Sequence, residues 1–357
     1  MAQRTLLFSA SDPLIDKKRE RNQFPAFVLS LMFWQFIEHT ITVSEHQRLM
    51  TNNTFTWSEW GQLDGLALAE LVRCGEVSAL EIAGQATQAL FALDNSLEST
   101  LEVFEDVARR PGMEGSRADG VLFGVPLVLK DLGARLKGRR QESGSSLFKG
   151  CVSEWTDPFV ARLLEAGLIP LGRSTTAELG LAWDTSTLHL GTPKVSRNPF
   201  DSRRTPGGSS GGSAALVAAG AVPIGSSSDG GGSTRIPASH CGLIGLKPTR
   251  GLCPRPLDSS EYISRISTDG VITRTVRDTA AVLDYSACVA QGGAFMSVGS
   301  DAGQYLSSLQ QKRPSLRFAW SEGLWGRSAP IPPDISEKLR EAASLLTSLD
   351  CEAVEIP

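Results

Sequence analysis

Cysteine and histidine are scarce in this chain, and neither residue type is clustered. The six cysteines are scattered: Cys74, Cys151, Cys241, Cys253, Cys288 and Cys351. Without a C-x-x-C pair, this spacing predicts reduced thiols in a cytoplasmic protein rather than a disulfide framework or a zinc site. The four histidines are also isolated: His39, His46, His189 and His240. We therefore expect neither a metal nor another cofactor.

The chain also lacks a strong excess of charge. Its 357 residues carry a formal net charge of −4, and 21% of them are charged. The globular part has no dense block of lysine and arginine, which argues against a nucleic-acid partner. The hydrophobic content of 41% is ordinary for a soluble enzyme, and the length is sufficient for a large core.

Residues 1–49 differ in character from the rest of the chain. A basic cluster at 17–21 precedes an apolar run at 24–37, but Pro25 interrupts the run and no small-residue cleavage site comes after it. The run is also too short to span a bilayer comfortably, so no membrane partner is expected. We expect residues 1–49 to be an atypical, poorly ordered extension upstream of Met50, with a membrane or sorting role as the alternative.

From residue 50 onward, strand-like and helix-like segments alternate, which predicts an α/β protein with a mixed sheet between layers of helices. No linker interrupts 50–357, so one domain is expected. The last segment, 351–357, has a strand-like pattern that stops at the final residue, and we expect the domain to be partial. The segments predicted to be helical are 63–72, 78–93, 158–167, 276–289 and 334–349, and the predicted strands are 127–129, 168–171 and 316–320.

Some of the expected helices have recognisable N-terminal signals. Ser78 and Glu81 have the spacing of a capping box. The pair Asp157-Pro158 begins another helix by the rule of an N-cap residue followed by a first-turn proline. Asp334 is the N-cap candidate of the last helix.

Two glycine clusters, 207–212 and 229–235, each contain a serine, Ser209 and Ser233. Because glycine has no Cβ, backbone amides in such loops can approach a substrate closely. A serine hydroxyl beside several amide donors is suited to attack on a carbonyl group. The apolar, helix-forming run at 214–219 between the clusters argues against a flexible linker.

Other interpretations of the glycine clusters fit less well. A phosphate loop requires a lysine followed by Ser or Thr after the second glycine, and that lysine is absent. The segment 207–211 satisfies the G-x-S-x-G pattern of an α/β-hydrolase elbow. That fold also needs a downstream histidine, and only His240 is found there, where packing is the expected role. The elbow remains an alternative.

A lysine base would remove the need for a histidine. Lys130 ends the apolar run 125–129, and burial would lower its pKa toward the neutral form that can accept a proton. On its own, a lysine at a strand end is more often a solvated surface group. The adjacent carboxylate of Asp131 would favour a charged lysine, so we expect Asp131 to point outward.

These segments, read together, resemble the three signature segments of the amidase signature family. The resemblance rests on Gly-Val-Pro-Leu-Val-Leu-Lys130-Asp, Gly-Gly-Ser209-Ser-Gly-Gly-Ser and Asp229-Gly-Gly-Gly-Ser233-Thr-Arg, and it covers about residue 57 to the end. It implies the amidase-signature fold and a Ser–Ser–Lys triad. Ser233 would be the nucleophile that forms an acyl-enzyme, and Ser209, after a cis peptide bond, would link it to the general base Lys130.

The resemblance also implies supporting roles around the triad. The backbone amides expected to form an oxyanion hole are those of Gly230, Gly231, Gly232 and Ser233. Asp229 and Arg235 would form a buried ion pair that holds the loop, with two unrelated surface charges as the alternative. Ser210 is expected to supply a supporting hydrogen bond.

Within the family, the motifs look most similar to bacterial amidases of the 6-aminohexanoate-cyclic-dimer hydrolase type. The resemblance implies hydrolysis of a small-molecule carboxamide or a linear or cyclic amide, with no cofactor and with a homodimer as one option. One alternative is the glutaminase subunit of a tRNA-dependent amidotransferase. Another is a truncated, non-catalytic remnant.

Overall fold

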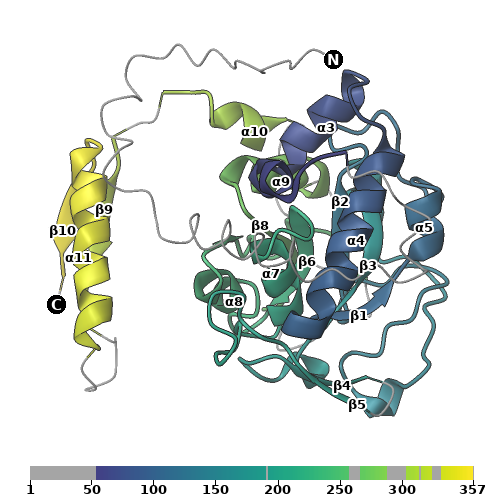
Figure 1. Cartoon of the computed structure of the whole chain (residues 1–357). Helices are drawn as coiled ribbons and strands as arrows, with labels where there is room; N and C mark the ends of the chain where they lie inside the picture. The colour runs from purple at the N-terminus through teal and green to yellow at the C-terminus, as the bar shows by residue number, and fades with distance from the viewer. Residues whose placement is uncertain are drawn as a thin grey trace. The chain divides into compact units, whose positions relative to one another are not determined.

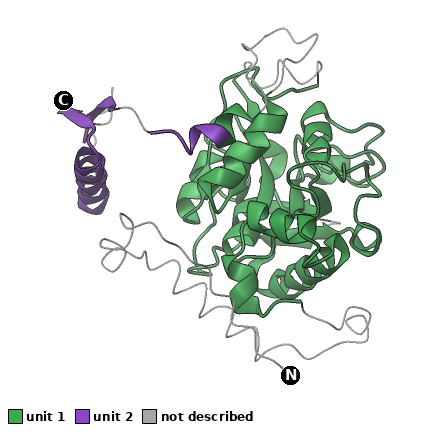
Figure 2. Ribbon diagram, turned by 90° about the horizontal axis from the view of Figure 1, so that it is seen from above, with its two compact units in different colours: residues 1–306 green, residues 307–357 purple. Residues whose placement is uncertain are grey.

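The structure is a computed structural model that describes residues 54–189, 192–256, 266–287, 303–312, 315–323 and 331–356. The expectations for residues 1–49 fall outside these ranges. The chain divides into two compact units, residues 1–306 and 307–357, and each unit is described by itself (Figure 2). The sequence shows no linker at this point and does not predict the division.

A mixed six-stranded sheet forms the centre of the first unit (Figure 1). The strands follow the order β1-β3-β2-β6-β8-β7. Strands β3, β2 and β6 are parallel, whereas β1, β8 and β7 each pair antiparallel with their neighbours. The bounds are β1 Thr100–Val103, β2 Pro126–Lys130, β3 Ile169–Ser174, β6 Ile224–Asp229, β7 Ile244–Gly245 and β8 Thr268–Thr273. The predicted α/β class with a mixed sheet is confirmed.

Helices cover the sheet. Asp157 is the N-cap residue of α6 (Pro158–Glu165) as expected, but its side chain makes no capping hydrogen bond, whereas α4 (Ala79–Leu97) begins with the expected capping box. The Ser78 hydroxyl accepts a hydrogen bond from the Glu81 amide at 3.2 Å, and the Glu81 carboxylate accepts one from the Ser78 amide at 2.8 Å, which confirms the capping box. Among the described residues, no helix is long and apolar enough to cross a bilayer. The helices are α2 Trp57–Gln62, α3 Gly65–Arg73, α4 Ala79–Leu97, α5 Glu105–Arg109, α6 Pro158–Glu165, α7 Gly211–Ala218, α8 Arg235–His240, α9 Val276–Ser286 and α10 Gln304–Ser308.

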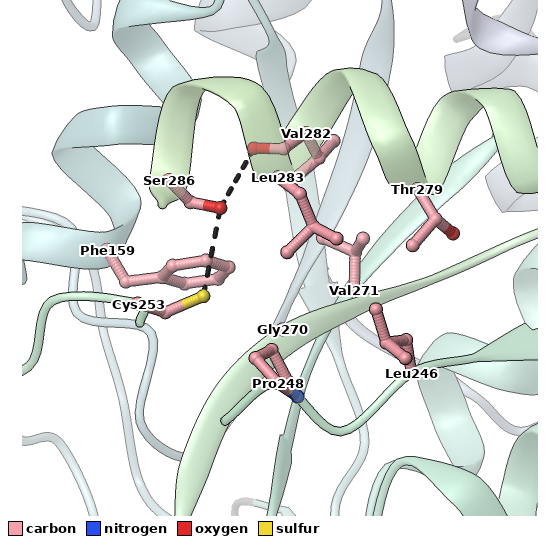
Figure 3. A pocket seen from close by; sticks show the side chains of 10 residues that line it. All are labelled: Phe159, Leu246, Pro248, Cys253, Gly270, Val271, Thr279, Val282, Leu283 and Ser286. Carbon is pink, nitrogen blue, oxygen red and sulfur yellow. Dashed lines mark hydrogen bonds between the residues drawn. The ribbon is translucent and has the colours of Figure 1, made fainter. Parts of the chain in front are cut away.

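Adjacent residues of β8 show that helices pack on both faces of the sheet, because successive strand side chains point to opposite faces. Val271 lines a cavity of about 10 Å³ together with residues of α6 and α9: Phe159, Val282 and Leu283 (Figure 3). Ile272 packs instead with residues of α7 and α8: Ala214, Ala218 and Ala238. A cavity of this size holds about one water molecule, so it is a packing space rather than a ligand site.

The central strand β2 carries the residue of greatest functional interest at its carboxyl end. All of β2 is buried, since β3 lies on one side of it and β6 on the other.

The sequence analysis did not predict the edge strand β1 or the hairpin of β4 Ser186–His189 with β5 Thr192–Val195. These strands are short, and β4 and β5 are mostly exposed, so neither has a long apolar run.

The second unit is a β–α–β arrangement. Strand β9 (Arg317–Trp320) pairs parallel with β10 (Glu352–Glu355), and α11 (Pro333–Ser348) connects them. The predicted helix and strands are confirmed. Asp334, however, is not the N-cap residue: Pro332 occupies that position without a side-chain hydrogen bond, and Asp334 lies in the first turn. A carboxylate in the first turn interacts favourably with the helix dipole, so the residue remains near the position its chemistry favours.

Gly167 and Gly75 each follow a helix, and together they test how tightly the backbone after α6 packs against the backbone at Phe123. Both have positive φ, 94° for Gly167 and 71° for Gly75. A Cβ at Gly167 would lie 2.6 Å from the Phe123 Cα, whereas a Cβ at Gly75 would meet nothing within 4 Å. We expect Gly75→Ala to lower the free energy of unfolding by roughly 1 kcal/mol, and Gly167→Ala by about 1–3 kcal/mol more. Urea denaturation measures both values, and equal losses would contradict the packing argument.

Candidate active site

Lys130 lies fully buried at the carboxyl end of β2, with an exposed fraction of 0%. Its Nζ donates to the Ser209 hydroxyl oxygen at 2.8 Å and to the Ser228 hydroxyl oxygen at 2.9 Å. Its backbone amide donates to the Ser226 hydroxyl oxygen at 2.8 Å. The structure therefore brings Lys130 and Ser209 into direct contact although 79 positions separate them in the sequence.

The environment of Lys130 favours its neutral form. Burial lowers the pKa of Lys130 to about 7, because the interior solvates an ammonium ion poorly. The carboxylates of Asp269 and Asp229 oppose this effect and raise the pKa, but burial outweighs them. At neutral pH a large fraction of Lys130 is therefore unprotonated and able to act as a base.

The prediction that Asp131 points outward is wrong. Asp131 is buried, and its carboxylate accepts hydrogen bonds from the backbone amides of Glu142 at 2.8 Å and Gly144 at 2.9 Å. Burial raises the pKa of Asp131 to about 6, against the opposing effect of the Arg173 guanidinium and these two amides. Asp131 follows the last residue of β2, and these two amides hold its carboxylate, so it is buried without a hydrogen bond to the Lys130 amine.

The first glycine cluster is held tightly against the strands. The peptide bond between Gly208 and Ser209 is cis, as the resemblance implies. The Ser209 carbonyl accepts hydrogen bonds from the Thr176 hydroxyl at 2.9 Å and the Ala177 amide at 3.2 Å. A Cβ on Gly208 would lie 2.4 Å from the Asp184 carbonyl oxygen, so only glycine fits at this close approach.

Ser210 makes a hydrogen bond between the two serine loops through its backbone. Its amide donates to the Ser233 carbonyl at 3.2 Å, which links the two serine loops. Its hydroxyl oxygen is buried and has no hydrogen-bond partner among the described residues.

Asp229 organises the second glycine cluster. Its carboxylate accepts hydrogen bonds from the backbone amides of Gly232, Thr234 and Arg235 at 2.8, 3.2 and 3.3 Å. The Arg235 guanidinium adds two contacts of 2.9 Å. Burial opposes ionisation of Asp229, but the guanidinium and the amides outweigh it and hold its pKa below the ordinary value. The ion pair is present, although it is not buried throughout: the Arg235 side chain is 52% exposed and the Asp229 side chain 1%.

This network changes the expectation for the oxyanion hole. The Gly232 amide already donates to Asp229, so it is not free to bind a substrate oxygen. Gly230, Gly231 and Ser233 lie on the same loop, and Gly231 is exposed whereas Ser233 is buried. Fixing the Gly232 amide stabilises the turn that presents the neighbouring amides.

Several polar residues of the site were missed in the sequence. Ser226 and Ser228 both bond to Lys130, one to its backbone amide and one to its amine. They are two residues apart in β6, so they lie on one face of the sheet, and this spacing just before Asp229 was the available signal. Arg173, which is buried in β3, donates to the Lys130 carbonyl at 3.0 Å and holds the end of β2 in place.

A buried lysine bonded to a serine that follows a cis peptide bond, with a second serine in an adjacent glycine loop, is the arrangement that the resemblance to the amidase signature family implies. A family model described as "Amidase" matches residues 81–357. The chain belongs to this amidase family. Membership of this family excludes the α/β-hydrolase alternative. His240, the histidine on which that alternative depended, is exposed at the end of α8, so the expectation that it packs in the interior is wrong.

Known relatives show the same similarity. The "6-aminohexanoate-cyclic-dimer hydrolase" of Paenarthrobacter ureafaciens is 34% identical over 290 residues, which cover 80% of this chain and 57% of the relative. The A subunit of the glutamyl-tRNA(Gln) amidotransferase of Exiguobacterium sp. is 33% identical over 298 residues, which cover 81% of this chain and 60% of the relative.

Solved structures agree with these sequence relatives. A structure of 6-aminohexanoate cyclic dimer hydrolase complexed with substrate matches with a TM-score of 0.76 and 31% identity, covering 83% of this chain and 61% of that chain. The native peptide amidase of Stenotrophomonas maltophilia matches with a TM-score of 0.70 and 26% identity, covering 83% and 62%. The chain thus spans about three fifths of the length of these relatives.

Thr185 offers a test of how the first serine loop is held. Its hydroxyl donates to the Gly207 carbonyl at 2.9 Å and accepts from the Gly211 amide at 3.0 Å. Removing the hydroxyl leaves both backbone groups buried and unpaired, so we expect Thr185→Val to lower the free energy of unfolding by about 1–3 kcal/mol.

Thr187 provides the matched control for this substitution. It is also buried, but its hydroxyl oxygen has no hydrogen-bond partner among the described residues. We expect Thr187→Val to leave the free energy of unfolding unchanged or to raise it, because no hydrogen bond is lost and an unpaired buried hydroxyl is removed. Denaturant melts of the two variants test the comparison, and similar losses in both would contradict the proposed clamp.

Proposed function

We propose that this chain hydrolyses a carboxamide or another amide C–N bond through the triad Lys130, Ser209 and Ser233. The contact between a fully buried lysine, whose pKa is about 7, and the Ser209 hydroxyl at 2.8 Å carries the proposal. A charged surface lysine could not serve as a general base at neutral pH, whereas this one can.

The proposed proton relay runs from Ser233 through Ser209 to Lys130. When Lys130 is neutral, the Ser209 hydroxyl can donate to its lone pair across the same 2.8 Å contact. Ser209 then passes its own proton to Lys130 and accepts the Ser233 proton as the Ser233 oxygen bonds to the substrate carbonyl carbon. The relay runs in reverse when the tetrahedral intermediate collapses: the C–N bond breaks, and the proton passes to the departing amine. Water then attacks the acyl-enzyme by the same route and releases the acid.

The second loop supplies the electrostatic part of the proposal. Charge develops on the carbonyl oxygen during attack, and backbone amides stabilise it where they are already oriented. We assign this role to the amides of Gly230, Gly231 and Ser233, and each is worth about 3–4 kcal/mol of transition-state stabilisation. Asp229 and Arg235 hold the loop in shape, so they act on the reaction through backbone position.

A second candidate is the glutaminase subunit of a tRNA-dependent amidotransferase. The 33% identity to the corresponding subunit of the Exiguobacterium enzyme favours it, because the same relay can release ammonia from glutamine. Turnover of glutamine only in the presence of a partner subunit would support this candidate over a free-standing amidase. The buried contact between Lys130 and Ser209 argues against a non-catalytic remnant, and we propose that residues 50–357 form part of an amidase domain.

The nucleophile assignment predicts selective covalent labelling. A fluorophosphonate probe should label Ser233 in the unaltered chain, and Ser233→Ala should abolish the label. Ser210→Ala should keep it, because the Ser210 hydroxyl makes no hydrogen bond to a described residue. Mass spectrometry of the digested protein locates the label. Undiminished labelling of Ser233→Ala would remove Ser233 from the mechanism.

The base assignment predicts a specific pH profile. Lys130 must be neutral to accept a proton, so kcat/KM should rise about tenfold per pH unit below pH 7 and level off above it. The residual activity of Lys130→Ala should lack this rise. Initial rates between pH 5 and about 9 test the profile. If kcat/KM of Lys130→Ala still rises with pH below pH 7, the titration belongs to another group.

A further inference from the structure

A short segment, residues 180–184, runs along the first serine loop. A Cβ on Gly180 would lie 3.5 Å from the Ser209 hydroxyl oxygen. At the other end of the segment, the Asp184 carbonyl oxygen is the closest neighbour of a Cβ built on Gly208, at 2.4 Å. Both ends of the segment therefore lie beside Ser209 or the glycine that precedes it.

Hydrogen bonds fix the chain on both sides of this segment. Before it, Thr176 and Ala177 donate to the Ser209 carbonyl. After it, the Thr185 hydroxyl donates to the Gly207 carbonyl. The side chains between these anchors are thus held at a defined distance from the triad, which is the requirement for a residue that positions a substrate.

Trp183 extends this contact to the second serine loop. Its indole Nε1 lies 3.9 Å from the Cβ position of Gly231, whose amide is assigned above to the oxyanion hole. The Trp183 side chain is 70% exposed, and the neighbouring Leu181 is 72% exposed. A large aromatic side chain on a fixed segment gains nothing for stability when it faces water. Aromatic side chains of this kind are typical anchors in binding sites.

The chemistry of the segment narrows the ligand. Residues 180–183 are Gly-Leu-Ala-Trp and carry no charge, whereas Asp184, the last residue of the segment, is an exposed carboxylate. The cation of the second serine loop, Arg235, is already paired with Asp229 through two contacts of 2.9 Å. The surface that Leu181 and Trp183 offer is therefore apolar and aromatic, with a carboxylate at its end, and it fits a neutral planar apolar group better than an anionic one.

We propose that Trp183 is a specificity-determining residue: it stacks on a planar apolar group joined directly to the scissile amide. This inference rests on the proposed amide hydrolysis, since it places the ring relative to Ser233 and the oxyanion loop. The planar group can be attached to the carbonyl carbon or to the nitrogen of the amide, and in both cases it would stack on the Trp183 ring.

Three neutral amides test the proposal with the full chain. Acetamide has no ring, benzamide carries the ring on the acyl side, and acetanilide carries it on nitrogen. In Trp183→Ala, the ratio of kcat/KM for a ring-bearing amide to that for acetamide should fall about 10-fold. Trp183→Phe should retain most of the selectivity. The amide whose ratio falls identifies the side on which the ring binds.

Trp155→Ala is the matched control. Trp155 is also an exposed tryptophan, 46% accessible, but its ring lies against a different group, with its centroid 5.0 Å from the Arg135 guanidinium carbon. Its replacement should leave the ratio unchanged. Equal losses on all three amides in Trp183→Ala would overturn the proposal, because they would indicate a general structural effect.

Binding to a Ser233→Ala chain separates this inference from the proposed function. NMR titrations should show that ring-bearing amides bind, and that Trp183→Ala in this background weakens binding about 10-fold. Such binding without any turnover by the unaltered chain would contradict the hydrolysis and keep the stacking role. Binding that does not depend on Trp183, or no binding of either ring-bearing amide, would overturn the inference.

Discussion

The burial of one amine controls the properties of this site. Lys130 is enclosed at the end of the central strand β2, where it contacts the hydroxyls of Ser209 and Ser228. A lysine in water would be charged at neutral pH, but here the loss of solvation brings its pKa to about 7. The sheet provides this environment because β3 and β6 flank β2 and helices cover both faces of the sheet. A neutral amine can therefore serve as the base in place of a histidine.

The two serine loops depend on backbone hydrogen bonds more than on side-chain packing. Thr176 and Thr185 fix the carbonyls of the first loop, and the Asp229 carboxylate collects three amides of the second. One bond from the Ser210 amide to the Ser233 carbonyl connects the loops. The glycines permit these close approaches, since a Cβ at Gly208 would overlap the neighbouring chain. The same geometry orients the amides to which we assign the stabilisation of developing negative charge.

Much of the fold was predictable where local signals are strong. The capping box at Ser78, the Asp157-Pro158 helix start and the apolar strand before Lys130 each depend on chemistry within a few residues. The edge strand β1 and the hairpin β4–β5 were missed because they are short and have no long apolar run. Asp131 was misplaced because its burial depends on the amides of Glu142 and Gly144, which a pattern of neighbours does not reveal.

The sequence by itself determined the α/β class, the residues that carry the proposed chemistry and their resemblance to the amidase signature family. It could do so because glycine clusters, serines and a lysine after an apolar run are local features with specific chemical requirements. Only the tertiary structure decided that Lys130 is buried and contacts Ser209, that the Gly232 amide is occupied by Asp229, and that Trp183 stands exposed beside Gly231. Packing decides which residues far apart in the chain come into contact and which lose their contact with water. It therefore sets the pKa of Lys130, decides which backbone amides remain unpaired, and shapes the surface beside the serines.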